Sequence, residues 1–78
     1  MRKYEHYDKD GCFHTWRIVP TFMQSGVRVF HEESNKDTVC AFGDMIFKNS
    51  EAAERRIERM LSYAMETKQI FSYTVKEV

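Results

Sequence analysis

One helical stripe among strand-like segments constrains this chain more than any other feature of its sequence. Between Ser50 and Met65 apolar residues recur at the spacing of one helix face, namely Ala53, Ile57, Met60, Leu61 and Ala64. The segment contains no glycine or proline, and Asn49 or Ser50 is a natural N-cap. The chain therefore has a single amphipathic helix with which to cover a sheet.

The remaining segments alternate in the manner of strands. Asp10-Gly11 predicts a two-residue hairpin turn, because a type I′ turn needs positive φ at both central positions. We expect a further turn over residues 24–26 and a polar loop over residues 33–37, and the apolar run 45–47 fits no single element. The expected strands are Tyr4–Tyr7, Cys12–Val19 with a continuation over Thr21–Met23, Val27–Glu32, Thr38–Phe42 and Gln69–Val78.

This order predicts an α+β fold in one domain that spans residues 1–78. We expect a two-layer sandwich, in which one helix covers one face of a four- or five-stranded, mainly antiparallel sheet with the order β-β-β-β-α-β. A core this small usually needs a disulfide, a metal or a second subunit as support. No apolar leader follows Met1, so we expect a cytoplasmic protein with reduced thiols at Cys12 and Cys40, stabilised as a homodimer.

Aromatic residues are numerous, at 11 of 78, and they are expected on both faces of the sheet. In the second expected strand Trp16 alternates with Phe13, so the two rings point to opposite faces. One helix covers one face. Either the sheet curls over itself, with residues 45–47 closing the open side, or the second face is exposed to bind a partner. We favour the second alternative.

A protein-binding surface needs large anchoring side chains and charged groups at its rim. The strand candidates are Phe13, Trp16, Arg17, Arg28 and Phe30, and the helix adds Arg55, Arg56 and Arg59. Arg17 and Arg28, together with the helix arginines, would set the orientation of the partner. The alternative is that Trp16 and Phe30 belong to the core, and for Trp16 the pattern favours the core, because it shares a face with Cys12 and Ile18.

Metal and catalytic chemistry find little support in the spacing of the residues. With Asp10-Gly11 at the centre of the turn, His6 pairs with Thr15 and lies on the opposite face from His14. No C-x₂-C or H-x₃-H spacing is present, and the aspartates fall in turns, where turn chemistry explains them. We therefore expect no metal, no cofactor and no enzymatic activity, and a metal-dependent enzyme remains only a distant third alternative.

Nucleic-acid binding is the alternative function. The helix arginines and the sheet aromatics suit phosphates and bases, but the 12 basic and 12 acidic residues balance, and glutamates share the polar arc of the helix. A solvated helix face with ion pairs explains these arginines more simply.

The order of a hairpin, a capped helix that begins near SEAAERRIERML, and a closing strand resembles small accessory proteins encoded by phages and prophages. The resemblance covers size and element order only. Since such proteins often act by binding one host protein, it implies a non-catalytic regulator or inhibitor from a phage or mobile element.

Overall fold

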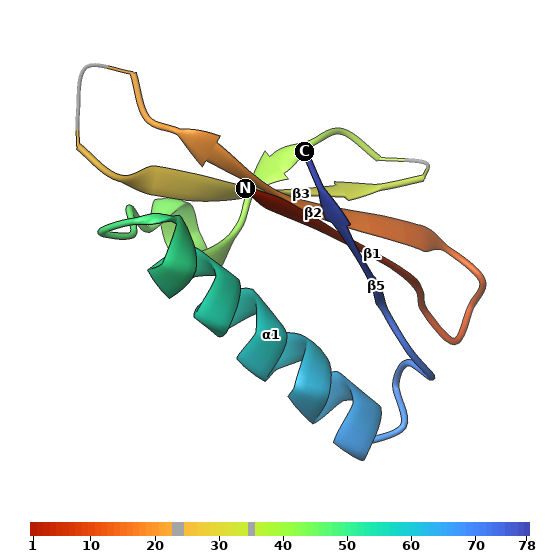
Figure 1. The fold of residues 1–78 in the computed structure, drawn as a ribbon. Helices are drawn as coiled ribbons and strands as arrows, with labels where there is room; N and C mark the ends of the chain where they lie inside the picture. Colours follow the sequence, from red (N-terminus) through yellow and green to blue (C-terminus); the bar gives the residue numbers. More distant parts are fainter. Residues whose placement is uncertain (23–24, 35) are drawn as a thin grey trace.

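The computed structural model describes residues 1–22, 25–34 and 36–78, and its sheet has five antiparallel strands in the order β4-β3-β2-β1-β5. One helix, α1, lies along one face of this sheet (Figure 1). The elements are β1 Arg2–Tyr7, β2 Phe13–Pro20, β3 Val27–Glu33, β4 Val39–Cys40, the 3₁₀ turn η1 Phe42–Asp44, α1 Ser50–Glu66 and β5 Thr74–Glu77. The predicted α+β fold and its element order are confirmed.

Some predicted boundaries are wrong. The fourth strand is only two residues long, because the chain turns into η1 at Phe42, which has a positive φ. The last strand begins at Thr74 rather than at Gln69, since α1 ends in a turn with Lys68 in the left-handed region. Met23, Gln24 and Asn35, which fall in the expected strand continuation, turn and loop, lie outside the described residues.

The helix forms as its pattern predicts. Asn49 is the N-cap, and its side-chain oxygen accepts a hydrogen bond from the Ala52 N–H at 2.9 Å. The helix buries Ala53, Ile57 and Leu61 against the sheet. No helix in the described part of the chain is long and apolar enough to cross a membrane.

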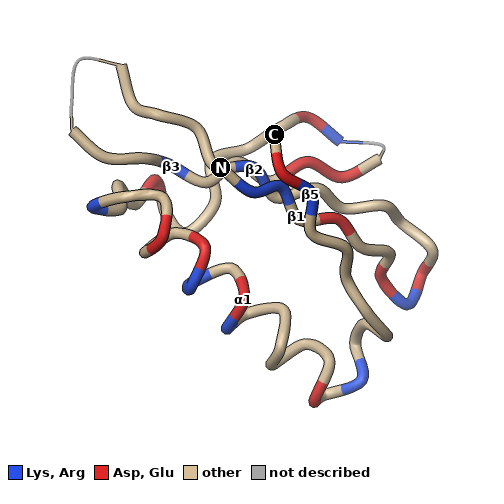
Figure 2. Tube along the Cα trace, viewed as in Figure 1, with Lys and Arg blue, Asp and Glu red and all other residues tan. Residues whose placement is uncertain are grey.

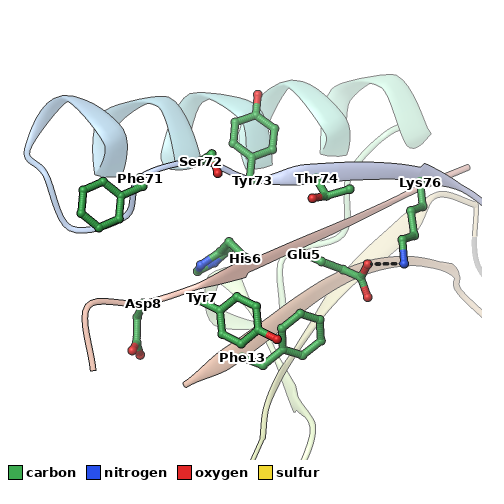
Figure 3. Close-up of a pocket in the computed structure, with 10 residues that line it drawn as sticks. All are labelled: Glu5, His6, Tyr7, Asp8, Phe13, Phe71, Ser72, Tyr73, Thr74 and Lys76. Atoms are coloured by element: carbon green, nitrogen blue, oxygen red, sulfur yellow. Dashed lines mark ion pairs between the residues drawn. The ribbon is translucent and has the colours of Figure 1, made fainter. Parts of the chain in front are cut away.

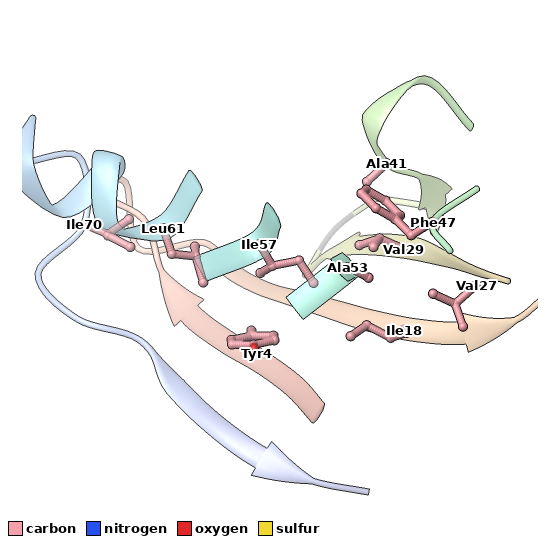
Figure 4. Close-up of a cluster of buried hydrophobic side chains, with 10 residues drawn as sticks. All are labelled: Tyr4, Ile18, Val27, Val29, Ala41, Phe47, Ala53, Ile57, Leu61 and Ile70. Carbon is pink, nitrogen blue, oxygen red and sulfur yellow. The ribbon is translucent and has the colours of Figure 1, made fainter. Parts of the chain in front are cut away.

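The core lies between the helix stripe and the inner face of the sheet, which is the face that α1 covers (Figure 4). The buried cluster comprises Tyr4, Ile18, Val27, Val29, Ala41, Phe47, Ala53, Ile57, Leu61 and Ile70. Phe47 pairs with Val27 through two backbone hydrogen bonds, of 2.8 and 2.9 Å. The run 45–47 thus brings Phe47 to the inner face, so the alternative in which this run closes the open side is wrong.

The turn between β1 and β2 differs from the prediction in a way that changes the register. Asp8 N–H donates to the Cys12 carbonyl and Gly11 N–H to the Asp8 carbonyl, so three residues form the loop. Gly11 has a positive φ of 83°, but Asp10 does not, which excludes a type I′ turn. His6 consequently faces His14 instead of Thr15, and the two histidines share the inner face.

Tyr4 joins the sheet to the helix. Its side chain is fully buried, and its hydroxyl donates a hydrogen bond to Glu58 of α1. Burial, and then the bond to Glu58, raise the pKa of this phenol. Arg2 also donates to Glu58, at 3.1 Å, so one carboxylate receives both groups from β1.

Tyr4→Phe should lower the free energy of unfolding by about 1–3 kcal/mol, because a hydrogen bond to a charged group is lost. The wild-type chain should also lose stability as the pH rises above about 10, since tyrosine in the unfolded chain releases its proton while folded Tyr4 retains it. Urea unfolding followed by circular dichroism between pH 7 and 11 measures both effects. Tyr63→Phe, on the exposed side of α1, is the matched control and should change neither.

Gly26→Ala should destabilise the fold more than Gly11→Ala. Both glycines have positive φ, but a Cβ at Gly26 would lie 2.4 Å from the Phe47 carbonyl oxygen, whereas one at Gly11 meets nothing within 4 Å. Gly11→Ala should therefore cost only the left-handed strain of about 1–2 kcal/mol, and Gly26→Ala should also separate Val27 from Phe47. Equal losses in urea unfolding would contradict this account.

Candidate functional site

Four flat side chains form a stacked cluster on the inner face of the sheet. They are His6 from β1, His14 and Trp16 from β2, and His31 from β3. Residues that face each other across neighbouring strands stack: the His6 and His14 ring centroids lie 4.8 Å apart, and those of Trp16 and His31 lie 3.9 Å apart. We refer to these four residues as the histidine–tryptophan cluster.

Diagonal neighbours in this cluster are joined by hydrogen bonds. Trp16 Nε1–H donates to His6 Nε2 at 3.0 Å, and His14 Nδ1 lies 2.8 Å from His31 Nε2. Because the indole nitrogen can only donate, neutral His6 carries its proton on Nδ1. That atom is buried and has no hydrogen-bond partner among the described residues. Burial, and then the nearby His14, lower the pKa of His6.

Asp8 organises the edge of the cluster. One carboxylate oxygen accepts the backbone N–H groups of Asp10 and Cys12, at 2.8 and 3.0 Å, which stabilises the hairpin loop. The other oxygen lies 2.7 Å from His14 Nε2. The bond to His14, and then the Cys12 N–H, lower the pKa of Asp8 to about 2. Asp8 is therefore ionised near neutral pH and accepts a hydrogen bond from His14 Nε2–H. The lone pair of His14 Nδ1 then points toward His31.

A pocket of about 350 Å³ opens beside the cluster. All four rings of the cluster line it, and Asp8, Lys9 and Asp10 of the hairpin loop lie at its polar side. The helix and the segment after it supply the opposite wall, with Met60, Leu61, Ala64, Gln69 and Ile70. Burial lowers the pKa of His6 and of His31, and histidines with a shifted pKa beside a pocket are typical of a ligand site.

Glu33 adds a carboxylate to the same end of the sheet. It faces His14 across the β2–β3 pair and lies two residues after His31, so all three side chains share the inner face. One ligating atom from each of His14, His31 and Glu33 falls within 4.8 Å of the other two. Glu33 also pairs with exposed Lys36 at 3.4 Å. These three residues are therefore the described group best placed to hold a metal ion.

The predicted interface residues of the strands divide between the two faces. The register places Phe13, Arg17, Arg28 and Phe30 on the outer face, which is the face that α1 leaves uncovered. Trp16 points to the inner face and packs against the core, which is the alternative that its shared face with Ile18 favours. The cause is the alternation of β2, in which Trp16 lies on the same side as buried His14 and Ile18.

Part of the outer face is hollowed where β2 and β3 approach their connection. Val19, Pro20, Thr21, Phe22, Arg28 and Phe30 surround a depression of about 270 Å³. Phe22 is 90% exposed and Phe30 is half-buried. The Nε atom of Arg28 is buried, and it has no hydrogen-bond partner among the described residues. We call this depression the Arg28 hollow.

A groove of about 490 Å³ separates β1 from the segment that leads into β5. Figure 3 shows Tyr7 beside Phe13 on one side of it and Phe71 on the other. The Tyr7 and Phe13 ring centroids lie 5.1 Å apart. Lys76 closes one end through its ion pair with Glu5, at 2.8 Å. The predicted anchors Phe13 and Phe30 thus line different hollows.

The helix arginines lie among acidic residues along α1. Basic and acidic residues alternate along α1 (Figure 2). Arg55, Arg56 and Arg59 are all exposed, and the Arg56 guanidinium lies over the Phe42 ring at 4.8 Å. Glu54 and Glu58 of the same helix pair with Arg2 of β1. Among the described residues these ion pairs therefore join the helix glutamates to β1 and not to the helix arginines, and nucleic-acid binding by the arginines stays a prediction.

Sequence reasoning missed the histidine–tryptophan cluster because it gave the first loop two residues instead of three, which shifts the strand register by one residue. The signal was present: Asp8 three residues before Gly11 is typical of a type I turn that ends in a left-handed glycine, which makes a three-residue loop. That loop brings His6 opposite His14. The approach of His31 depends on the β2–β3 register, which places it diagonally to His14.

Comparison of the chain with models of protein families, with characterised proteins and with solved structures found no match.

Trp16→Phe should lower the free energy of unfolding by about 1–3 kcal/mol, because the buried Nε2 of His6 loses its donor. His6→Leu alone should leave the Trp16 N–H without its acceptor. The double variant should cost less than the sum of the two single changes, since both partners are then removed together. Urea unfolding at pH 7 gives the three values, and strict additivity would contradict a hydrogen bond between these side chains.

Proposed function

We propose that this chain is a non-catalytic protein-binding module that holds its partner on the outer face of the sheet. The Arg28 hollow carries the proposal, because it combines exposed aromatic surface with a guanidinium that has no ion pair among the described residues. Half-buried Arg28 forms no ion pair among the described residues, so a partner that supplies a carboxylate would balance a charge that nothing in the described part of the chain pairs with.

The chemistry of the hollow indicates what kind of partner fits it. Phe22, Phe30 and Val19 offer apolar contact around Arg28. A guanidinium favours a carboxylate, which can accept two parallel hydrogen bonds. The partner is therefore a protein segment that presents an apolar side chain next to an aspartate or glutamate.

The surroundings of the hollow support binding without catalysis. Arg17 and Glu32, neighbours on the outer face, form a loose ion pair at 3.8 Å and give the hollow a charged rim. The likeness in size and element order to small phage accessory proteins supports a host protein as the partner, which the chain would regulate or inhibit. Nucleic-acid binding has no comparable support, since glutamates interrupt the helix arginines.

Selection from a displayed library of random peptides tests this proposal. Enriched peptides should carry an aromatic or aliphatic residue beside Asp or Glu. Phe30→Ser and Arg28→Gln should each weaken the binding of a selected peptide by at least about tenfold, a loss within the range of hot-spot residues. Phe71→Ser is the matched control, because Phe71 is 99% exposed but lines the other groove.

The other possible occupants of this face give distinct results. Sedimentation that shows a dimer in the wild type but a monomer in Phe30→Ser would assign the hollow to a second copy of the chain. Salt-sensitive retention on RNA or DNA that Arg55→Gln and Arg59→Gln abolish would favour nucleic-acid binding instead. Peptides that bind Phe30→Ser as tightly as the wild type would contradict the proposed site.

A further inference from the structure

The inner face holds a donor set that protein binding on the outer face does not use. His14, His31 and Glu33 offer two imidazole nitrogens and one carboxylate oxygen, with the three ligating atoms within 4.8 Å of one another. Two histidines and one acidic residue that leave a coordination position open are a ligand set found in catalytic zinc sites and in non-haem iron sites.

The hydrogen bonds around His14 select the nitrogen that faces the proposed ion. Nε2 of His14 lies 2.7 Å from the Asp8 carboxylate, which is bound to the backbone N–H groups of its own loop. A metal-bound histidine commonly donates its second N–H to a carboxylate, which fixes the ring and its tautomer. His14 therefore presents the lone pair of Nδ1, the atom that lies 2.8 Å from His31 Nε2.

We propose that the chain binds one divalent transition-metal ion of the zinc class through His14 Nδ1, His31 Nε2 and a Glu33 carboxylate oxygen. Asp8 is the positioning residue of this site. The proposal goes beyond the protein-binding function, because the ligands lie on the inner face, whereas the Arg28 hollow lies on the outer face.

Binding needs a small change in distance and a tilt of the two histidine rings, which lie nearly parallel with their bonded nitrogens between them. Zn–N bonds of about 2.0–2.1 Å in tetrahedral geometry separate two ligand nitrogens by roughly 3.3 Å. His14 Nδ1 and His31 Nε2 lie 2.8 Å apart, so their separation must increase by about half an ångström for the ion to replace their direct hydrogen bond. His31 then carries its proton on Nδ1. Glu33 leaves its pair with Lys36, an exposed contact that contributes little to stability.

The surroundings of the site also suit a bound ion. His14 and His31 line the pocket of about 350 Å³, so a fourth ligand, either water or a small molecule, can reach the ion from that side. The His6 ring stacks on His14 and the Trp16 ring stacks on His31, and these contacts hold the two ligand rings in place. Stacking therefore supports the ligand rings, and the pocket leaves one side of the ion open, as expected for an exchangeable ligand.

Zn²⁺ titration of the full chain, expressed without a histidine tag and stripped with a chelator, tests the proposal. One equivalent should bind. Glu33→Gln and His31→Gln should weaken the affinity by at least about tenfold, and Asp8→Asn by about 10- to 100-fold through the loss of its support. Glu32→Gln is the matched control, because Glu32 adjoins Glu33 on β3 but points to the outer face. The Zn²⁺ affinity of this variant should equal that of the wild type.

Co²⁺ supplies a readout that separates lost ligands from lost folding. The wild type and Glu32→Gln should show the visible absorption bands of Co²⁺ bound by protein nitrogens, and Glu33→Gln should show them weakened or shifted. Circular dichroism confirms that each variant is folded, and if His31→Gln unfolds, the more accessible Glu33→Gln decides the question. The proposal is overturned if the wild type binds less than one equivalent of Zn²⁺, or if Glu33→Gln binds Zn²⁺ as tightly as Glu32→Gln.

Discussion

The hydrogen bonds of Asp8 are the interaction on which the rest of the inner face depends. One of its oxygens holds the loop that sets the β1–β2 register, and the other orients His14. A register shifted by one residue would turn His6 to the outer face and leave the Trp16 N–H without its acceptor. A single ionised carboxylate at a turn therefore stabilises the hairpin and aligns the cluster.

The side chains that form the core change from apolar to polar aromatic along the length of α1. Near the start of α1 it is apolar, with Ala53, Val29 and Phe47 in contact, whereas near the end of α1 stacked histidines and Trp16 take the place of aliphatic side chains. A polar core is stable only when its polar groups have hydrogen-bond partners, because burial removes their bonds to water and only a partner in the protein compensates for that loss. His6 and Arg28 carry the buried side-chain atoms that lack partners in the described part of the chain.

Strand β3 shows how the two proposed functions coexist in so short a chain. Its residues alternate, so Arg28 and Phe30 point to the outer face while Val29, His31 and Glu33 point to the inner face. The outer residues border the Arg28 hollow, and the inner ones continue from the core into the proposed metal site. Because both surfaces depend on the same strand, a change that moves β3 would affect both, whereas a substitution on one face should leave the other intact.

The sequence by itself determined the helix, its cap and its buried stripe, since 3.6-residue periodicity and capping are local properties that Asn49 and Ile57 display directly. It also determined the order of the elements, and by alternation it placed Arg28 and Phe30 on the same face of their strand. Only the tertiary structure decided the hairpin register, the short β4 and β5, and the meeting of His6, His14 and His31. Pairing between strands depends on how each turn closes, and one residue of difference in a loop exchanges the two faces of a strand.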